Sequence, residues 1–399
     1  MRYLQALACA LALAPSVVFA APSISGFQGN PYIGKEGYAN QEYARKLDQT
    51  IQYFNQRNDY QNAARTRTVQ KIPTFAWISV SSDVYKIRGL ISETLAAQTA
   101  TRRQQILQLV VYNLPNRDCS AGASAGEFQL DNDGLNKYKR YIDNIANELN
   151  TAEARNINFV VILEPDSVAN IVTGSNVPAC SRAAPAYKEG IAYAIAKLQH
   201  PNVSLYIDAA NGGWLGWDSN LRPTATILAE ILRQARAINS SASVRGVAIN
   251  VSNFNEYIAR VREPFTEYSN SWDESHYAQS LAPHLEQAGF PAHFIVDQTR
   301  AGRGGIRTEW GQWCNVRNAG FGTRPTSDQG VLQNQYVDAI VWVKPGGESD
   351  GTSDRGSPRF SETCAGPVAH VPAPEAGSWF NEYAANLVRL ANPELPPTY

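Results

Sequence analysis

The chain alternates between short apolar runs and longer amphipathic segments. The apolar runs are rich in β-branched residues and predict seven strands, at Pro73–Val80, Ile106–Tyr112, Phe159–Leu163, Val203–Ile207, Gly246–Val251, His293–Val296 and Val337–Val343. Between them, apolar residues recur with the helical period over Asp83–Ala97, Leu135–Asn150, Ala186–Leu198, Thr224–Ile238 and Tyr277–Ala288. Two more helices are expected at Gln41–Gln56 and Ser378–Leu390. Regular alternation of strand and helix predicts a parallel α/β sheet.

An open doubly wound sheet and a closed barrel both satisfy this pattern. Seven strands is one fewer than the eight of the common α/β barrel. No linker of low complexity and no internal repeat divides the chain, so residues 21–399 are expected to form one domain. The stretch 298–336 lacks a helical period and is rich in Gly, Arg and Trp, which is typical of a functional loop.

Residues 1–20 have the pattern of a secretory signal peptide. Arg2 precedes an apolar run over Leu4–Leu13, and small residues near Ala20 form a cleavage site. Because the run is too short to cross a membrane as a helix, we expect a secreted protein without membrane association. Three Asn-x-Ser triplets are candidate glycan acceptors, at Asn202, Asn239 and Asn250.

Four cysteines lie outside the predicted signal peptide: Cys119, Cys180, Cys314 and Cys364. An even number in a secreted chain predicts two disulfide bonds. Order along the chain favours Cys119–Cys180 and Cys314–Cys364, although the sequence alone allows three pairings. A zinc site is the alternative, but the sequence has no CxxC motif and its five histidines are scattered, so no metal is expected.

The charges nearly cancel, and this narrows the classes of partner. The chain has 35 Lys and Arg against 36 Asp and Glu, without a basic block. Neutralising a phosphate backbone needs a basic excess, so no nucleic acid partner is expected. The chain also carries 19 Tyr, 13 Phe and 8 Trp. Flat rings on loops would then suit stacking on sugars better than on bases.

Carboxylates follow five of the seven predicted strands, and aromatic rings accompany several of them. In parallel folds the carboxyl ends of the strands share one edge, where active sites form. Carboxylates beside flat rings suit glycoside hydrolysis, which needs an acid, a second carboxylate and platforms for sugar rings. In strand order, the residues are Trp77; Tyr112 and Asp118; Asp166; Asp208, Trp214 and Trp217; Asn250 and Asn253; Asp297; and Lys344, Glu348 and Asp350.

Several of these residues have a simpler structural alternative. An Asp after a strand often caps the next helix, which fits Asp208 and Asp297. The Trp77 ring could belong to the core. Arg117 could form an ion pair with Asp118, and such a pair would lower the pKa of Asp118.

A serine hydrolase is one candidate from another class. Gly122–Gly126 matches the nucleophile elbow of those enzymes around Ser124. A true elbow follows its strand directly, whereas the apolar run here ends at Leu114, ten residues before Ser124.

Two segments resemble the signatures of one family. Val110–Gly126 (VVYNLPNRDCSAGASAG) and Val160–Ala169 (VVILEPDSVA) look like glycoside hydrolase family 6, of the fungal cellobiohydrolase II type. The resemblance continues through YIDAANGGWLGW, NVSNFN, DQTRAGRGG, EWGQWCNV and VWVKPGGESDGTSD. It implies a distorted seven-stranded parallel β/α barrel with tunnel-forming loops, and inverting hydrolysis of β-1,4-glucosidic bonds. It implies no cofactor, and cellulose and cello-oligosaccharides as substrates. The sequence departs from many members in that we expect a catalytic domain without a cellulose-binding module, and we also expect a monomer.

The resemblance also implies roles for individual residues. Asp166 would be the general acid, and Asp118 would lie close to it and raise its pKa. Tyr112 would lie under the sugar at the cleavage point, and Ser124 would help to hold a chain of water molecules. The catalytic base stays open between Asp350 and a water relay to Asp118.

The same resemblance implies a substrate track and a roof over it. Trp77, Trp214, Trp217 and Trp313 would stack on glucose rings, and Lys344 and Glu348 would hydrogen-bond sugar hydroxyls. Asp208, Asn250 and Asn253 are added to these substrate-binding candidates because they follow strands.

Two roof loops would enclose the track, at about 119–134 and between Asp350 and Cys364. Because both are full length, we expect an exo-acting enzyme that releases cellobiose from non-reducing ends. An endo-β-1,4-glucanase of the same fold is the alternative. From a different class, a non-catalytic cellulose-binding protein would keep the tryptophans but would not need Asp166.

Overall fold

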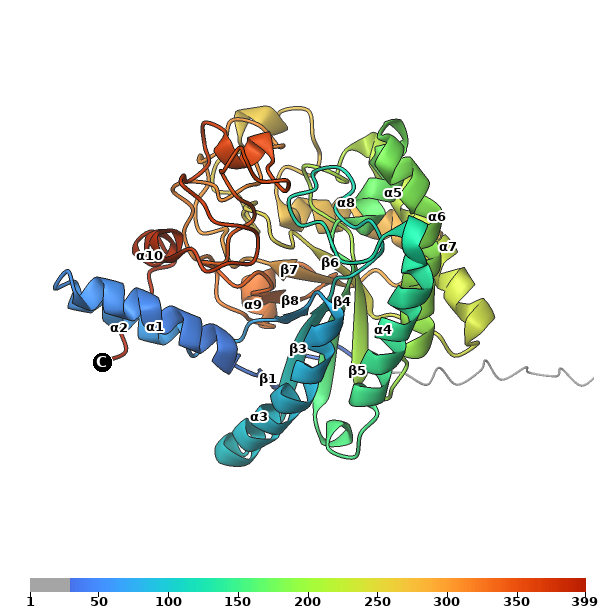
Figure 1. Ribbon diagram of the computed structural model, residues 1–399, viewed down its shortest axis with the longest axis horizontal. Helices are drawn as coiled ribbons and strands as arrows, with labels where there is room; N and C mark the ends of the chain where they lie inside the picture. The colour runs from blue at the N-terminus through green and yellow to red at the C-terminus, as the bar shows by residue number, and fades with distance from the viewer. Residues whose placement is uncertain (1–28) are drawn as a thin grey trace, which may run out of the picture.

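The computed structural model describes residues 29–399, so the predicted signal peptide lies outside the described residues. A parallel sheet occupies the centre of the molecule (Figure 1). Its order is β1-β3-β4-β5-β6-β7-β8, and β2 pairs with β3. The strands are β1 (Glu36–Gly37), β2 (Ala76–Ile78), β3 (Gln105–Val111), β4 (Asn158–Leu163), β5 (Val203–Asp208), β6 (Gly246–Ile249), β7 (Phe294–Asp297) and β8 (Val337–Val341).

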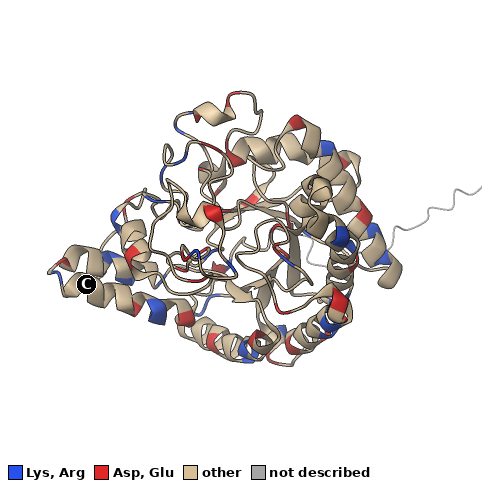
Figure 2. Cartoon of the chain, turned by 45° about the horizontal axis from the view of Figure 1, so that its top comes forward, with Lys and Arg blue, Asp and Glu red and all other residues tan. Residues whose placement is uncertain are grey.

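Helices cover the outside of the sheet (Figure 1). They are α1 (Gln41–Asn55), α2 (Tyr60–Val69), α3 (Lys86–Thr101), α4 (Gly134–Leu149), α5 (Ser167–Thr173), α6 (Pro178–Lys197), α7 (Asp218–Ile238), α8 (Glu274–Gln287), α9 (Gln329–Leu332) and α10 (Asn381–Arg389). Figure 2 shows Lys and Arg mixed with Asp and Glu along the outer helices, as the balanced charge of the chain predicted. None of the helices in residues 29–399 is long and apolar enough to cross a membrane.

The sheet curls until its two ends meet. β2 pairs in parallel with β3 at one end, and the Phe75 N–H just before β2 donates to the Trp342 carbonyl just after β8, at 3.2 Å. The Trp77 indole N–H donates to the Val343 carbonyl at 3.0 Å. The predicted fold class, a distorted parallel β/α barrel, is therefore confirmed, with the seam lying between β2 and β8.

Alternate residues of each strand face the inside and the outside of the barrel. Val110, Ile162 and Tyr206 belong to the inner cluster, whereas Leu109 and Val161 belong to the larger cluster under the helices. All seven residues of β3 are buried. Burial on both faces explains why the strands read as continuous apolar runs in the sequence.

All seven predicted strands form, but several boundaries differ. β6 was expected to continue to Val251 and ends at Ile249, because Asn250 adopts a left-handed conformation with φ of 61° that no strand accommodates. Helix α6 was expected to begin at Ala186, directly after Pro185. It begins instead at Pro178, a residue type well suited to a first helical position, and Pro185 lies within it.

The structure pairs Cys119 with Cys180 and Cys314 with Cys364, as chain order favoured. The first bond joins the loop after β3 to helix α6. The second joins the long loop after β7 to the loop after β8. Both bonds therefore fix segments at the carboxyl edge of the sheet.

Candidate active site

The segments that follow the strands gather at the top of the molecule in Figure 1. Several of the predicted site residues in these segments have an unusual backbone conformation. Positive φ angles occur at Asp118 (56°), Glu164 (54°), Asp166 (67°), Ala210 (52°) and Asn250 (61°). These residues are not glycines, so each angle costs conformational energy that the surrounding structure must offset. Such strain concentrates at functional sites, because it directs side chains where relaxed backbone would not.

Asp166 lies in the turn between β4 and α5. Its backbone N–H donates to Asp208 Oδ1 at 2.9 Å. Burial raises the pKa of Asp166 well above its usual range, and the negative charges of Asp208, Asp118 and Asp350 raise it further. A raised pKa favours the protonated form of the carboxyl group, which is the form that a general acid requires.

Asp118 is held by Ser124, which also contacts Tyr112. Asp118 Oδ2 accepts hydrogen bonds from the Ser124 backbone N–H at 2.7 Å and from its hydroxyl at 3.1 Å. The Tyr112 and Ser124 hydroxyl oxygens lie 2.9 Å apart. Burial raises the pKa of Asp118, while the bonds from Ser124 act in the opposite direction. The sequence-predicted residues Tyr112, Ser124, Asp118 and Asp166 thus meet at one place.

Arg117 does not pair with the neighbouring carboxylate. Its guanidinium donates to the backbone carbonyls of Ser79, Tyr112 and Ser124, and lies 4.4 Å from the centre of the Tyr112 ring. No ion pair of residues 29–399 joins it to Asp118. The prediction of a direct ion pair is therefore wrong, although the charge of Arg117 still acts to lower the pKa of Asp118. Arg117 instead braces the segment that carries Tyr112 and Ser124.

Asp350 is surrounded by positive groups. Arg300 Nη1 donates to both carboxylate oxygens, at 2.9 and 2.7 Å, and Lys344 Nζ lies 3.6 Å from Oδ1. The Asn315 backbone N–H donates to Oδ2 at 2.8 Å. Both carboxylate oxygens of Asp350 are therefore engaged by cations or by a backbone N–H.

Asp208 holds the backbone of Asp166 in place. It is 1% exposed, and its Oδ1 accepts the N–H groups of Asp166 and Ala210 at 2.9 and 3.0 Å. Burial raises the pKa of Asp208 to about 7. Its bonds to the backbone of β4–α5 and of its own loop make it a positioning residue, and its predicted contact with substrate stays a prediction.

One side of the site is formed by Trp77, Lys344 and Glu348. The edge of Trp77 meets the Tyr112 ring, with centres 5.6 Å apart. Lys344 Nζ lies 5.9 Å from the Trp77 ring centre. Glu348 pairs with Lys46 of α1 at 2.7 Å. A half-buried ring between charged hydrogen-bonding groups is the pattern of a sugar subsite.

The other side carries Trp214 and Trp217, in the loop between β5 and α7. The Trp214 indole N–H donates to Thr173 Oγ1 at the end of α5, at 2.8 Å. The Trp217 indole N–H donates to the Gly213 carbonyl at 3.0 Å. Both residues are half-buried, so each indole has a hydrogen-bonded orientation while part of the side chain stays accessible.

The remaining candidates are more deeply placed. Asn250 is fully buried and donates to the carbonyls of Asn255 and Asp297, so its side chain is not free to carry a glycan. The side-chain oxygen Oδ1 of Asn253 accepts a hydrogen bond from Arg307 Nη1 at 3.1 Å. Asp297 accepts N–H groups from three loops at the carboxyl edge, including Ser252 and Lys344. Trp313 is half-buried beside the disulfide cysteine Cys314.

The two roof loops touch. Arg359 Nε, in the loop between Asp350 and Cys364, donates to the carbonyl of Ala123 in the 119–134 loop, at 3.1 Å. A Cβ atom added at Gly351 would lie 3.2 Å from the Ala123 Cβ, so the two loops also approach each other closely at these two residues. The site between Asp118 and Asp350 is therefore bridged by a direct contact between loops.

Sequence reasoning missed three residues of this region. Arg300 follows β7 and holds Asp350, Trp310 packs beside Trp217, and Arg359 joins the roof loops. All three lie in loops, and their partners are far away in sequence. The available signals were the quoted segments DQTRAGRGG and EWGQWCNV, which contain Arg300 and Trp310, and the predicted roof loop that contains Arg359; they identified the segments but not these residues.

These features define a class of protein: an α/β barrel with a buried carboxyl group of raised pKa, a second oriented carboxylate and half-buried aromatic rings near two joined loops, as in glycoside hydrolases. The family model for glycosyl hydrolases family 6 matches residues 32–391. The chain belongs to glycosyl hydrolase family 6.

Relatives and solved structures cover nearly the whole chain. Exoglucanase 3 of Agaricus bisporus is 48% identical over 92% of this chain and 80% of its own length. The crystal structure of CcCel6C, a family 6 enzyme from Coprinopsis cinerea, has a TM-score of 0.91 and 61% identity over 93% of this chain and 100% of that chain. Endoglucanase-6B of Humicola insolens is 44% identical over 92% of this chain and 99% of its own length.

Replacing Asp208 with Asn tests the electrostatic account of Asp166. The amide oxygen can still accept the N–H groups of Asp166 and Ala210, but the negative charge is lost. Since that charge raises the pKa of Asp166, the variant should lower it. An acid must be protonated to act, so the alkaline limb of the kcat/KM profile on cellotetraose should move to lower pH. An unchanged limb would show that Asp208 does not control this proton.

Proposed function

We propose that this protein is a cellobiohydrolase that hydrolyses β-1,4-glucosidic bonds of cellulose with inversion and releases cellobiose from non-reducing chain ends. The observation that carries the proposal is the pair Asp166 and Asp118 beneath roof loops joined by Arg359. The relatives named exoglucanase and cellobiohydrolase support the same activity.

Asp166 acts as the general acid in this proposal. Because its pKa is raised, the Asp166 carboxyl group can donate a proton to the glycosidic oxygen as the bond breaks, and the leaving sugar departs as an alcohol. The negative charges of Asp118 and Asp350 then face the positive charge that develops on the sugar ring. The same carboxylates that keep Asp166 protonated would therefore also stabilise the transition state.

The water that attacks the sugar needs a base on the opposite side of the ring. We favour the relay to Asp118 over direct action of Asp350. Both hydrogen bonds from Ser124 reach the Oδ2 atom of Asp118, whereas the oxygens of Asp350 are held by Arg300, Lys344 and Asn315. Ser124 also contacts Tyr112, which places its hydroxyl where it can orient a water molecule next to the sugar.

The aromatic residues form the proposed glucan track. Trp77, with Lys344 and Glu348, holds the two sugars that leave as cellobiose. Trp214 and Trp217 hold the remainder of the chain on the far side of Asp166. Trp313 completes the set of proposed stacking residues. Their half-buried rings support this assignment, because a glucose ring stacks on one face while the protein holds the other.

We infer that the protein acts outside the cell. Two disulfide bonds are typical of oxidising compartments, and residues 1–20 have the composition of a signal peptide. Cellulose is insoluble and is met only outside the cell, so secretion agrees with the proposed substrate. The predicted monomeric state stays a prediction.

An endo-acting glucanase is the second candidate, because the Humicola insolens relative carries that name. An endo enzyme must admit the middle of a chain, which requires an open cleft. The contact between Arg359 and Ala123 favours threading of a chain end instead. A serine esterase has less support. Its nucleophile would need an adjacent base such as histidine, whereas the Ser124 hydroxyl contacts Tyr112 and Asp118.

Replacing Asp166 with Asn tests the catalytic proposal. The amide has nearly the same size but no acidic proton, so turnover of cellotetraose should fall by roughly 10²- to 10⁴-fold. Binding of cellotetraose, measured by calorimetry, should persist. Asp131→Asn, an exposed residue in the 119–134 loop, is the control and should keep its activity. Unchanged hydrolysis by the Asp166 variant would overturn the assignment of the acid.

Replacing Arg359 with Ala tests the exo assignment. Loss of the bond to Ala123 should let the roof loops separate and admit internal segments of a chain. The variant should therefore reduce the viscosity of soluble cellulose faster, relative to the sugar it releases, than the unaltered protein. Arg355→Ala is the control, because Arg355 lies in the same loop but pairs with exposed Glu362. If Arg359→Ala and Arg355→Ala gave the same ratio of viscosity loss to released sugar, the result would argue against a closed roof.

A further inference from the structure

The loop between β6 and α8 exposes several large apolar side chains. Tyr268 is 87% exposed, Val261 76% and Ile258 49%. The loop, residues 258–272, is gold in Figure 1 and stands at the top of the molecule, on the side where the strands end. Exposed apolar residues are ordinary when scattered, but several in one short segment mark an interaction surface.

The aromatic rings of this loop continue those of the proposed glucan track. Phe265, in the short 3₁₀ helix Pro264–Thr266, meets Trp310 edge to face, with ring centres 5.2 Å apart. Trp310 meets Trp217 in the same way at 6.3 Å. Trp310 also packs against Gly213, where an added Cβ would lie 1.8 Å from a ring carbon. A series of three contacting rings therefore connects the track to the loop.

The loop is braced by its own side chains. Arg262 donates to the backbone carbonyls of Thr266, Glu267 and Ser269. The Asn270 amide donates to the carboxylate of Asp218, at the start of α7 and next to Trp217. A surface held in place before it meets a ligand loses little conformational entropy on binding.

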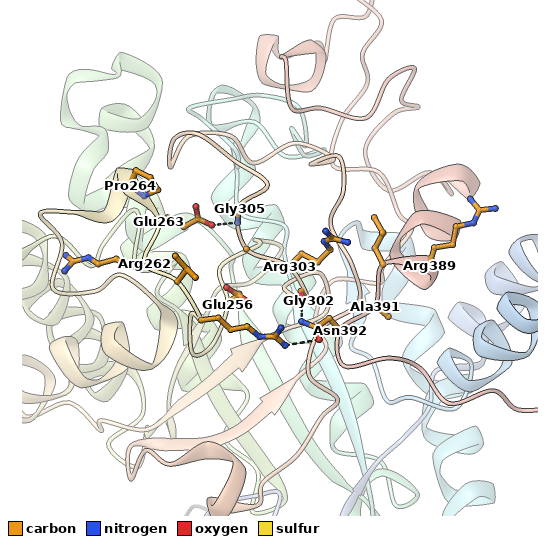
Figure 3. Close-up of a pocket in the computed structure, with 14 residues that line it drawn as sticks. Glu256, Arg262, Glu263, Pro264, Gly302, Arg303, Gly305, Arg389, Ala391 and Asn392 are labelled. Carbon is orange, nitrogen blue, oxygen red and sulfur yellow. Dashed lines mark hydrogen bonds between the residues drawn. The ribbon is translucent and has the colours of Figure 1, made fainter.

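The charges of the loop favour an uncharged ligand. Residues 258–272 contain Arg260 and Arg262 against Glu263 and Glu267, so they carry no net charge. Part of the loop also lines a pocket of about 550 Å³, shown in Figure 3. Arginines and glutamates line that pocket without any aromatic ring, so a sugar ring would stack on the aromatic residues of the loop instead.

We propose that residues 258–272 form a docking surface for insoluble cellulose, from which a surface chain passes over Trp310 to Trp217. This inference rests on the proposed function, because it takes the glucan track as its starting point. Cellulose is uncharged and presents flat rows of glucose rings, which the exposed Tyr268 ring and the neighbouring apolar side chains match. The partner is thus the polymer surface, which a soluble oligosaccharide does not reproduce.

The double variant Val261→Ser and Tyr268→Ala tests the surface without touching the site. Both side chains are exposed, so their loss should not disturb folding. Adsorption to microcrystalline cellulose should weaken by roughly 3- to 10-fold, as expected for losing one aromatic contact and an apolar neighbour. The kcat/KM on cellotetraose should stay unchanged. Tyr399→Ala is the matched control, because Tyr399 is 89% exposed near the chain end and away from the loop.

Adsorption equal to that of the unaltered protein would overturn the proposal. Equal losses on cellulose and cellotetraose would also overturn it, since the loop would then serve the reaction centre. Adsorption is measured without turnover, so failure of the proposed function has a separate signature: the unaltered protein would not hydrolyse cellotetraose. Weak adsorption of the Tyr399 variant would contradict the assignment of the surface to residues 258–272.

Discussion

The structure depends on keeping several carboxyl groups of like charge together in one buried region. Asp166 is influenced by the charges of Asp208, Asp118 and Asp350, and each of these three is held by a different partner. Asp208 accepts backbone N–H groups, Asp118 accepts both donors of Ser124, and Asp350 is paired with Arg300. Repulsion among them favours the protonated form of Asp166, and the proposed chemistry consumes that proton.

The barrel supplies the positions that such an arrangement requires. Parallel strands end at one edge, so residues far apart in sequence reach the same region. Left-handed backbone at Asp118, Glu164 and Asp166 then aims side chains that ordinary turns would not direct there. Cys119 and Cys364 each lie at one end of a roof loop, and Asp118 and Asp350 begin the same two loops. The disulfide bonds therefore restrain both the roof loops and the carboxylates that these loops carry.

The sequence predicted the fold well where burial follows a simple period. Strands buried on both faces, such as β3, read as apolar runs, and amphipathic helices such as α4 show one apolar stripe. Helix α2 was missed because Ala63 and Ala64 bury little area and give a weak pattern. The family signatures located Asp166 and Asp118. Contacts between loops, such as Arg300 with Asp350 or Arg359 with Ala123, depend on tertiary distances that no local pattern encodes.

The central claim is that Asp166 and a water activated through Asp118 act on opposite faces of the sugar. The most direct test is the anomeric form of cellobiose freshly released from cellohexaose, observed by proton NMR before the sugar equilibrates. Attack on the face opposite the leaving group inverts a β linkage, so the account predicts α-cellobiose as the first product. Initial release of β-cellobiose would contradict it, because retention requires a carboxylate nucleophile and a covalent intermediate.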